Sequence, residues 1–221
     1  MTTIAESRPG TTMASWERHS AFTGIVAVAC WVIGLAVIGD ISGKEKGAEL
    51  LAYYQAHDNR VVAGTVIWLI GVGVFVWFLG TLRSRLLATE GGEGKLTAIT
   101  FASGIAVATC LMLQPGPDLA GVLAKDDLDA SSARAIHAIG DAFFVGAEYF
   151  LPVMLVASTI LTLRTRLFPT WFAWVTVGIA VVLLVAPIGW AALVFAFPVW
   201  LLVLSFMLWA RMGTAERTAG F

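Results

Sequence analysis

The sequence predicts an all-α membrane protein, a polytopic bundle of six transmembrane helices. Of its 221 residues, 58% are hydrophobic and only 13% are charged, whereas a soluble domain has about 25% charged residues. The apolar residues also gather in six runs, each close to the length that crosses a bilayer as a helix. These runs cover residues 21–40, 61–82, 96–114, 142–163, 171–187 and 191–210. We treat them as a single membrane domain over residues 21–211.

Small residues and prolines shape the first three runs. In the second run, Gly64 pairs with Gly71 and Gly73 with Gly80 at heptad spacing, which predicts faces where another helix approaches closely. The polar connection over residues 41–60 is expected to hold a short interfacial helix. A glycine-rich, flexible linker follows the second run. The third run ends where Gln114-Pro-Gly-Pro-Asp118 breaks the helix, because proline lacks the backbone N–H.

The stretch from Ser131 to Leu163 is expected to form one long helix that contains the fourth span. Ser131 or Ser132 supplies a side-chain oxygen to cap its start. Pro152 is expected to kink it and to free the carbonyl of Glu148. Short connections between the fourth, fifth and sixth runs favour antiparallel neighbours.

Basic residues predict the orientation, since cytoplasmic loops carry an excess of Lys and Arg. Six spans put both termini on one side. If that side is cytoplasmic, it holds nine of the 14 Lys and Arg: Arg8, Arg18, Arg83, Arg85, Lys95, Arg164, Arg166, Arg211 and Arg217. Residues 1–20 are then a mobile cytoplasmic tail and residues 212–221 a second one. The start of the fourth helix faces the outside.

Composition and motifs exclude several classes of function. The net charge of −1 and the absence of a basic run give no argument for nucleic acid. The polar N-terminus does not resemble a signal peptide. Cys30 and Cys110 lack ligand spacing and are expected to be core residues. The sequence contains neither a phosphate-binding glycine loop nor a G-x-S-x-G motif.

Three ionisable residues share one stripe of the long fourth helix. His137 and Asp141 are four residues apart, and Glu148 follows seven residues later, so all three lie within about 40° of one another at 100° per residue. Counting back a normal span from Leu163 places Glu148 inside the membrane, Asp141 at its outer boundary and His137 within reach of water. Charged groups inside lipid usually face a cavity or a protein interior.

Other polar residues are expected at the same height as this stripe. Asp40 ends the first span and Asp118 follows the third, both on the outer side, and His57 could reach down from the loop above. We therefore expect an outward-facing polar cavity that Glu148, Asp141, His137, Asp118 and Asp40 line.

Three interpretations of this cavity stay open. It could bind or pass a small solute, a cation or a proton, without enzymatic activity. It could be the site of a metal-dependent membrane enzyme, since His137 and Asp141 at i and i+4 can reach one ion. It could also be structural, with Glu148 fixing helix packing in an accessory or sensor subunit. The cofactor and any metal stay unknown. The expected partners are the lipid bilayer, a small solute or cation, and a second copy of the chain.

The chain resembles a group of uncharacterised bacterial six-span membrane proteins that share a domain of unknown function. The resemblance covers roughly residues 47–211 and is carried by AELLAYYQAHDNRVVAG, FLGTLRSRL, HAIGDAFFVGAE, LRTRLFPTWFAWVTVGIAVVLLV and WLLVLSFMLWAR. It implies a multi-pass protein of the bacterial plasma membrane. It implies no activity and no site residue.

Overall fold

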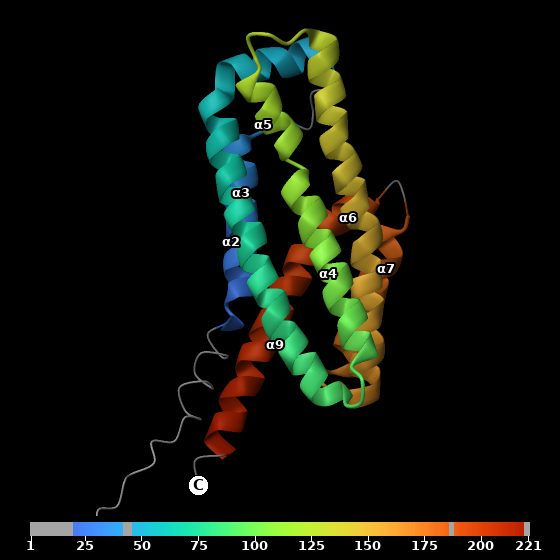
Figure 1. Ribbon diagram of the computed structural model, residues 1–221. Coiled ribbons are helices and arrows are strands. Elements are labelled where there is room, and N and C mark those ends of the chain that lie inside the picture. Colours follow the sequence, from blue (N-terminus) through green and yellow to red (C-terminus); the bar gives the residue numbers. More distant parts are fainter. Residues whose placement is uncertain (1–19, 42–45, 186–187, 219–221) are drawn as a thin grey trace, which may run out of the picture.

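The computed structural model describes residues 20–41, 46–185 and 188–218, and all elements in this part of the chain are helices (Figure 1). The α-helices are α2 (Thr23–Ile38), α3 (Gly47–Glu90), α4 (Lys95–Leu113), α5 (Gly116–Leu123), α6 (Ala130–Thr165), α7 (Thr170–Leu183), α8 (Gly189–Ala191) and α9 (Phe197–Thr218). A π-helix, η1 (Ala192–Ala196), joins α8 to α9. The predicted all-α class is confirmed.

Four of the predicted spans lie on helices that are long and apolar enough to cross a membrane. These are α3, α4 with α5, α6, and the run from α8 to residue 211. Helices α2 and α7 are apolar but have only 16 and 14 residues. At 1.5 Å per residue they measure about 24 and 21 Å, less than the roughly 30 Å of a hydrocarbon core. By length and composition, the structure thus contains four membrane-length helices and two shorter apolar ones.

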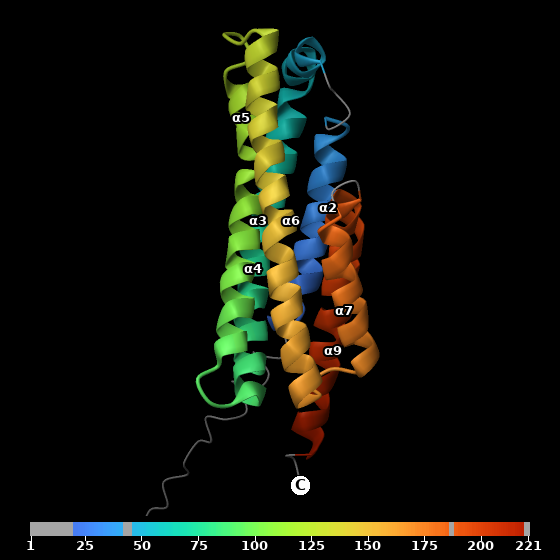
Figure 2. The same cartoon turned by 90° about the vertical axis from the view of Figure 1, so that its right-hand side faces the viewer.

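The helices pack as a bundle along one common direction. Helix α2 packs on α3, α4 packs on α6, and α7 packs on α6, while α9 crosses behind to contact α2 (Figures 1 and 2). Helix α5 and the first turns of α6 lie at one end of the bundle, here called the α5 end. Figure 2 shows that α7 stops well short of that end. Among the described residues, the helices at the α5 end are therefore α2, α3, α5 and α6.

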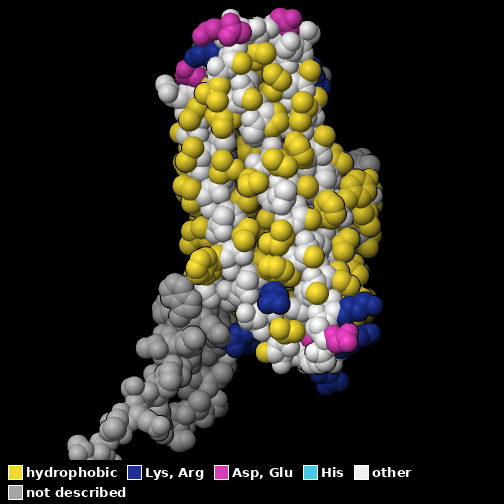
Figure 3. All heavy atoms as spheres, in the orientation of Figure 1, with side chains coloured by type: hydrophobic (Ala, Val, Ile, Leu, Met, Phe, Trp, Pro, Cys, Tyr) yellow, Lys and Arg dark blue, Asp and Glu magenta, His cyan; other side chains and the backbone are white. Residues whose placement is uncertain are grey.

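Side chains on the surface are sorted by type along the bundle. On the face shown in Figure 3, hydrophobic side chains cover the middle and charged side chains lie at the two ends, with Asp and Glu most prominent at the α5 end and Lys and Arg most prominent at the opposite end. Apolar side chains such as Val32, Trp174 and Phe195 are more than half exposed. Exposed apolar surface of this extent, on helices of membrane length, indicates a membrane location.

Glycines allow the closest helix contacts, but only half of the predicted pattern holds. A Cβ on Gly64 would lie 2.7 Å from the carbonyl oxygen of Gly34 in α2, and one on Gly71 would lie 2.8 Å from Cys30. The predicted close approach is confirmed for these two positions, within one chain. Gly73 and Gly80 have no atom within 4 Å of an added Cβ among the described residues, so the second pair meets no other helix of this chain there.

The glycine-rich connection between α3 and α4 forms a turn with defined contacts. Gly91, Gly92 and Gly94 adopt φ of 68°, 58° and 65°, a region that favours glycine. The Glu90 carboxylate then accepts hydrogen bonds from the backbone N–H of Leu96 and Thr97 at 2.7 and 2.8 Å. It caps α4 across the turn, because the first N–H groups of a helix lack internal partners.

The long fourth helix is confirmed, with one difference in how it begins. Asp129, not Ser131 or Ser132, caps α6, by accepting a hydrogen bond from the backbone N–H of Ser132 at 2.7 Å. Pro152 lies inside α6, which continues as a helix on both sides of it; the kink expected there stays a prediction. The expected interfacial helix is the start of α3, which is continuous with the second span except for non-helical angles at His57. The predicted tail at residues 1–20 lies almost wholly outside the described residues, and α9 continues to Thr218.

Candidate functional site

The site begins at the proline break between α4 and α5. Pro115 has no N–H, so the carbonyl of Leu111 loses its donor four residues along the chain. The indole N–H of Trp68, from α3, donates to that carbonyl at 2.7 Å. The carbonyl left unpaired at the break thus receives a hydrogen bond from a neighbouring helix. This bond also fixes the ring of Trp68 beside the break.

Helix α6 approaches this break closely because residue 140 is a glycine. A Cβ at Gly140 would lie only 2.6 Å from the carbonyl oxygen of Gln114, far inside a normal contact. His137 and Asp141 lie within one turn of Gly140, so this contact brings both side chains next to the start of α5. Asp118, in the first turn of α5, faces them.

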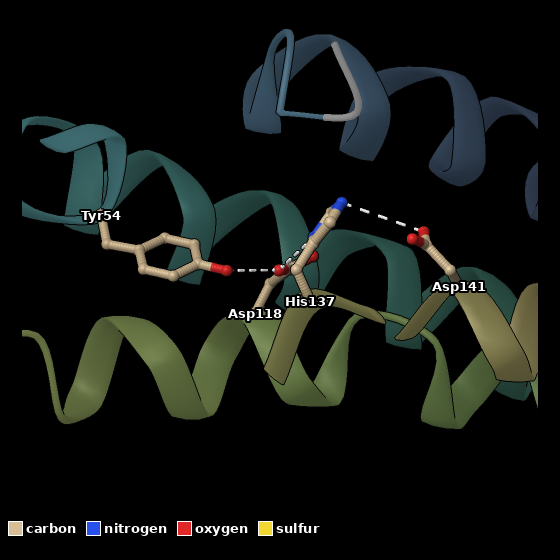
Figure 4. A network of polar contacts seen from close by, with 4 residues as sticks. All are labelled: Tyr54, Asp118, His137 and Asp141. Atoms are coloured by element: carbon tan, nitrogen blue, oxygen red, sulfur yellow. Dashed lines mark hydrogen bonds and ion pairs between the residues drawn. The ribbon is translucent and has the colours of Figure 1, made fainter. Parts of the chain in front are cut away.

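Four polar side chains then form a continuous network (Figure 4). The hydroxyl of Tyr54 donates to Oδ1 of Asp118 at 2.7 Å, and Nδ1 of His137 lies 2.8 Å from the same oxygen. The other ring nitrogen, Nε2 of His137, is 3.8 Å from Oδ1 of Asp141. Tyr54, Asp118 and His137 are buried, whereas the side chain of Asp141 is 59% exposed. The network thus runs from the protein interior to an accessible carboxylate.

This network forms one wall of a cavity of about 400 Å³, within the range of small-ligand sites. Helices α2, α3, α6 and α8, the α4–α5 break and η1 all contribute to its lining. Asp118, His137 and Asp141 supply its ionisable groups, and Trp68, Phe144 and Trp190 supply aromatic surface. No Lys or Arg is among these lining residues, all of which belong to the described part of the chain. The cavity therefore combines negative charge with aromatic rings.

Thr65 adds an unsatisfied polar group to the cavity. Its side chain is 1% exposed and lines the cavity from α3. Its hydroxyl has no hydrogen-bond partner among the described residues, although buried polar groups are nearly always paired. A bound molecule or water that reaches Thr65 would satisfy it.

The structure brings three of the five predicted site residues together. Asp118, His137 and Asp141 meet at the cavity, but His137 is buried between helices instead of reaching open water. Asp40 is exposed, next to the lining residue Gly39, and is not part of the lining. Glu148 also lies outside this lining, near the start of α8, where its Oε2 is 3.5 Å from a Cβ built on Gly189.

His57, the other residue expected near the site, does not reach the cavity. Its ring stacks on Tyr53 at 4.4 Å between centroids, and it is not among the cavity residues. Three residues that do matter were missed: Tyr54, Thr65 and Trp68. A tyrosine in a polar connection predicts only a headgroup anchor, and Thr and Trp within an apolar span predict only packing. Which face each presents depends on how the helices are rotated against each other.

The arrangement can bind a positive charge and can relay a proton along the network. Among the described residues, no group of three or more His, Cys, Asp or Glu has a geometry that could hold a metal ion. The carboxylates Asp118 and Asp141 lie on opposite sides of His137 (Figure 4), which separates them instead of converging them on one point. The metal-enzyme interpretation gains no geometric support here.

Comparison with known proteins does not assign the chain to a family. No protein-family model matches the chain, and comparisons with curated proteins and with solved structures found no match either. The resemblance described from the sequence stays a prediction.

Proposed function

We propose that this protein is a six-span protein of the bacterial plasma membrane that binds a small organic cation in the cavity beside α6. One observation carries the proposal. A single cavity combines the carboxylates of Asp118 and Asp141 with the rings of Trp68, Phe144 and Trp190, and has no basic residue other than His137 in its lining. Carboxylates and aromatic faces together are the groups that recognise ammonium ions.

The six-span topology is supported by how the two short helices are placed. Helix α2 packs along α3 and α7 packs along α6, and both carry exposed apolar side chains such as Val32 and Trp174. Apolar residues continue beyond α7, at Leu184 and Val185, so its apolar stretch is longer than the helix itself. Lys and Arg gather at the end opposite α5 (Figure 3), which favours a cytoplasmic location for that end and for both termini.

In this orientation the cavity opens at the outer boundary of the membrane. Asp141 is 24 residues from the end of α6 at Thr165, about 36 Å along the helix, slightly more than the thickness of a hydrocarbon core. The exposed carboxylate of Asp141 then lies at headgroup level, where water and cations have access. Asp118 and His137 lie behind it, shielded by protein.

The test compares a cation with an anion of similar size on the purified protein in lipid nanodiscs. We expect butyltrimethylammonium, measured by calorimetry, to bind, and butanesulfonate not to bind. Replacing Asp141→Asn should weaken binding about fivefold, the effect of a half-exposed charge pair worth about 1 kcal/mol. Asp127→Asn, at an exposed position on the α5–α6 turn, is the matched control. The proposal is wrong if the protein binds the two probes with equal affinity, or if the two variants bind butyltrimethylammonium with equal affinity.

A further inference from the structure

The cavity is not uniform, and its two parts differ in chemistry. The part next to α5 holds the ionisable groups Asp118, His137 and Asp141. The other part is walled by Leu35, Trp68, Phe144 and Val194. These same four residues also line a smaller neighbouring space of about 50 Å³ that is otherwise apolar. We call the part of the cavity that these four residues wall, together with the adjacent smaller space, the apolar arm.

The apolar arm points toward the middle of the membrane. Along α6, the lining passes from His137 and Asp141 to Phe144, and along α3 it passes from Val61 to Trp68. The second pair spans about 10 Å at 1.5 Å per residue. Since the ionisable groups lie at headgroup level in the proposed orientation, the arm lies within the hydrocarbon. This order of ionisable groups followed by apolar lining matches a lipid-like molecule, which has a polar head at the boundary and an apolar tail below.

The rim of the arm is exposed at the surface of the bundle. Leu35 of α2 and Trp190 of α8 line the cavity, yet they are 45% and 52% exposed. Helix α2 packs mainly on α3 and α9, so its outer half leaves room beside α8 and η1. A side chain that both lines a cavity and faces outward marks an opening. Here the opening is flanked by apolar side chains.

On this basis, and resting on the proposed function, we propose that the ligand is an amphipathic cation. Its ammonium head lies beside Asp141 and Asp118, and its alkyl tail fills the apolar arm and leaves toward lipid between α2 and the α8–η1 segment. The hydroxyl of Thr65, buried without a partner between the two parts, is placed to contact a polar group close to the head. A fully water-soluble amine would leave the arm unused.

The experiment measures affinity against tail length for alkyltrimethylammonium ions with two, four, six and eight carbons in the tail. Calorimetry is done on protein in nanodiscs, and partitioning into empty nanodiscs is subtracted. Each added methylene that reaches the arm should raise affinity about fourfold, the effect of burying one CH₂ group. The gain should stop when the arm is full.

Two variants test the contacts of the ammonium head and of the alkyl tail separately. Asp141→Asn should weaken all four ions by the same factor. Val194→Trp, which narrows the arm, should weaken the eight-carbon ion at least tenfold more than the two-carbon ion. Retained binding of the short ion also shows that Val194→Trp is folded.

The outcomes distinguish the two proposals. If no member binds in preference to the anion, the proposed function fails. If the four ions bind with equal affinity, or Val194→Trp weakens all of them alike, the cation site stands and the amphipathic ligand is wrong. A rise with tail length that Val194→Trp abolishes supports the proposal.

Discussion

Removing the Tyr54 hydroxyl should destabilise the protein by a predictable amount. Tyr54→Phe keeps the buried ring, which packs against Gly121, and deletes only the donor that lies 2.7 Å from Oδ1 of Asp118. Hydrogen bonds to charged groups contribute about 1.5–3 kcal/mol, and the buried Asp118 would lose one of the two contacts to its Oδ1. The remaining contact from His137 keeps the loss within that range.

The free energy of unfolding, from denaturant titration of the purified protein, should therefore fall by about 1.5–3 kcal/mol. The corresponding fall in Tm is about 3–12 °C for a chain of this size. Tyr149→Phe is the matched control, because Tyr149 is 62% exposed. A double-mutant cycle with Asp118→Asn should give a coupling energy of at least about 1 kcal/mol. If both tyrosine variants unfold alike, or the cycle shows no coupling, the network does not hold α3 to α5.

Three further variants test other steps of the reasoning. Gly140→Ala should lower the free energy of unfolding by about 1–3 kcal/mol, because its Cβ would meet the Gln114 backbone; Gly73→Ala, with open space around it, should cost nothing. Glu148→Gln should leave affinity for butyltrimethylammonium within about twofold of the original, since it lies about 10 Å along α6 from Asp141; a larger loss would place it in the site. The hydrogen bond from the backbone N–H of Ser132 lowers the pKa of Asp129 from 3.8. The difference in free energy of unfolding between the wild type and Asp129→Ala should therefore be constant above pH 3.8 and shrink as the pH falls below it. A difference that does not change with pH in unfolding titrations would contradict the cap.

The amino-acid pattern was sufficient for the helices themselves. Apolar runs of membrane length, proline breaks and glycine turns are local features, and each acts within a few residues of its own position. The break at Pro115 and the long helix through His137 and Asp141 could both be predicted for that reason. The lengths of α2 and α7 could not, because a helix end depends on where its neighbours leave backbone groups satisfied.

In the candidate site, too, local features could be predicted and the packing between helices could not. The i, i+4 spacing of His137 and Asp141 is a property of one helix, so their common stripe was readable from the sequence. Glu148 lies outside the cavity, beside Gly189 of α8. Its surroundings depend on where α8 packs along α6, and no local sequence pattern encodes that packing.

The sequence by itself determined that this protein is helical, that it is apolar enough for a membrane, and that α6 carries acids on one stripe. Only the tertiary structure decided that Tyr54, 64 residues before Asp118, completes their network, and that Trp68 repairs the proline break. The physical reason is that hydrogen bonds between helices depend on rotation and close approach. Contacts such as that of Gly140 with Gln114 fix these only when the whole bundle packs.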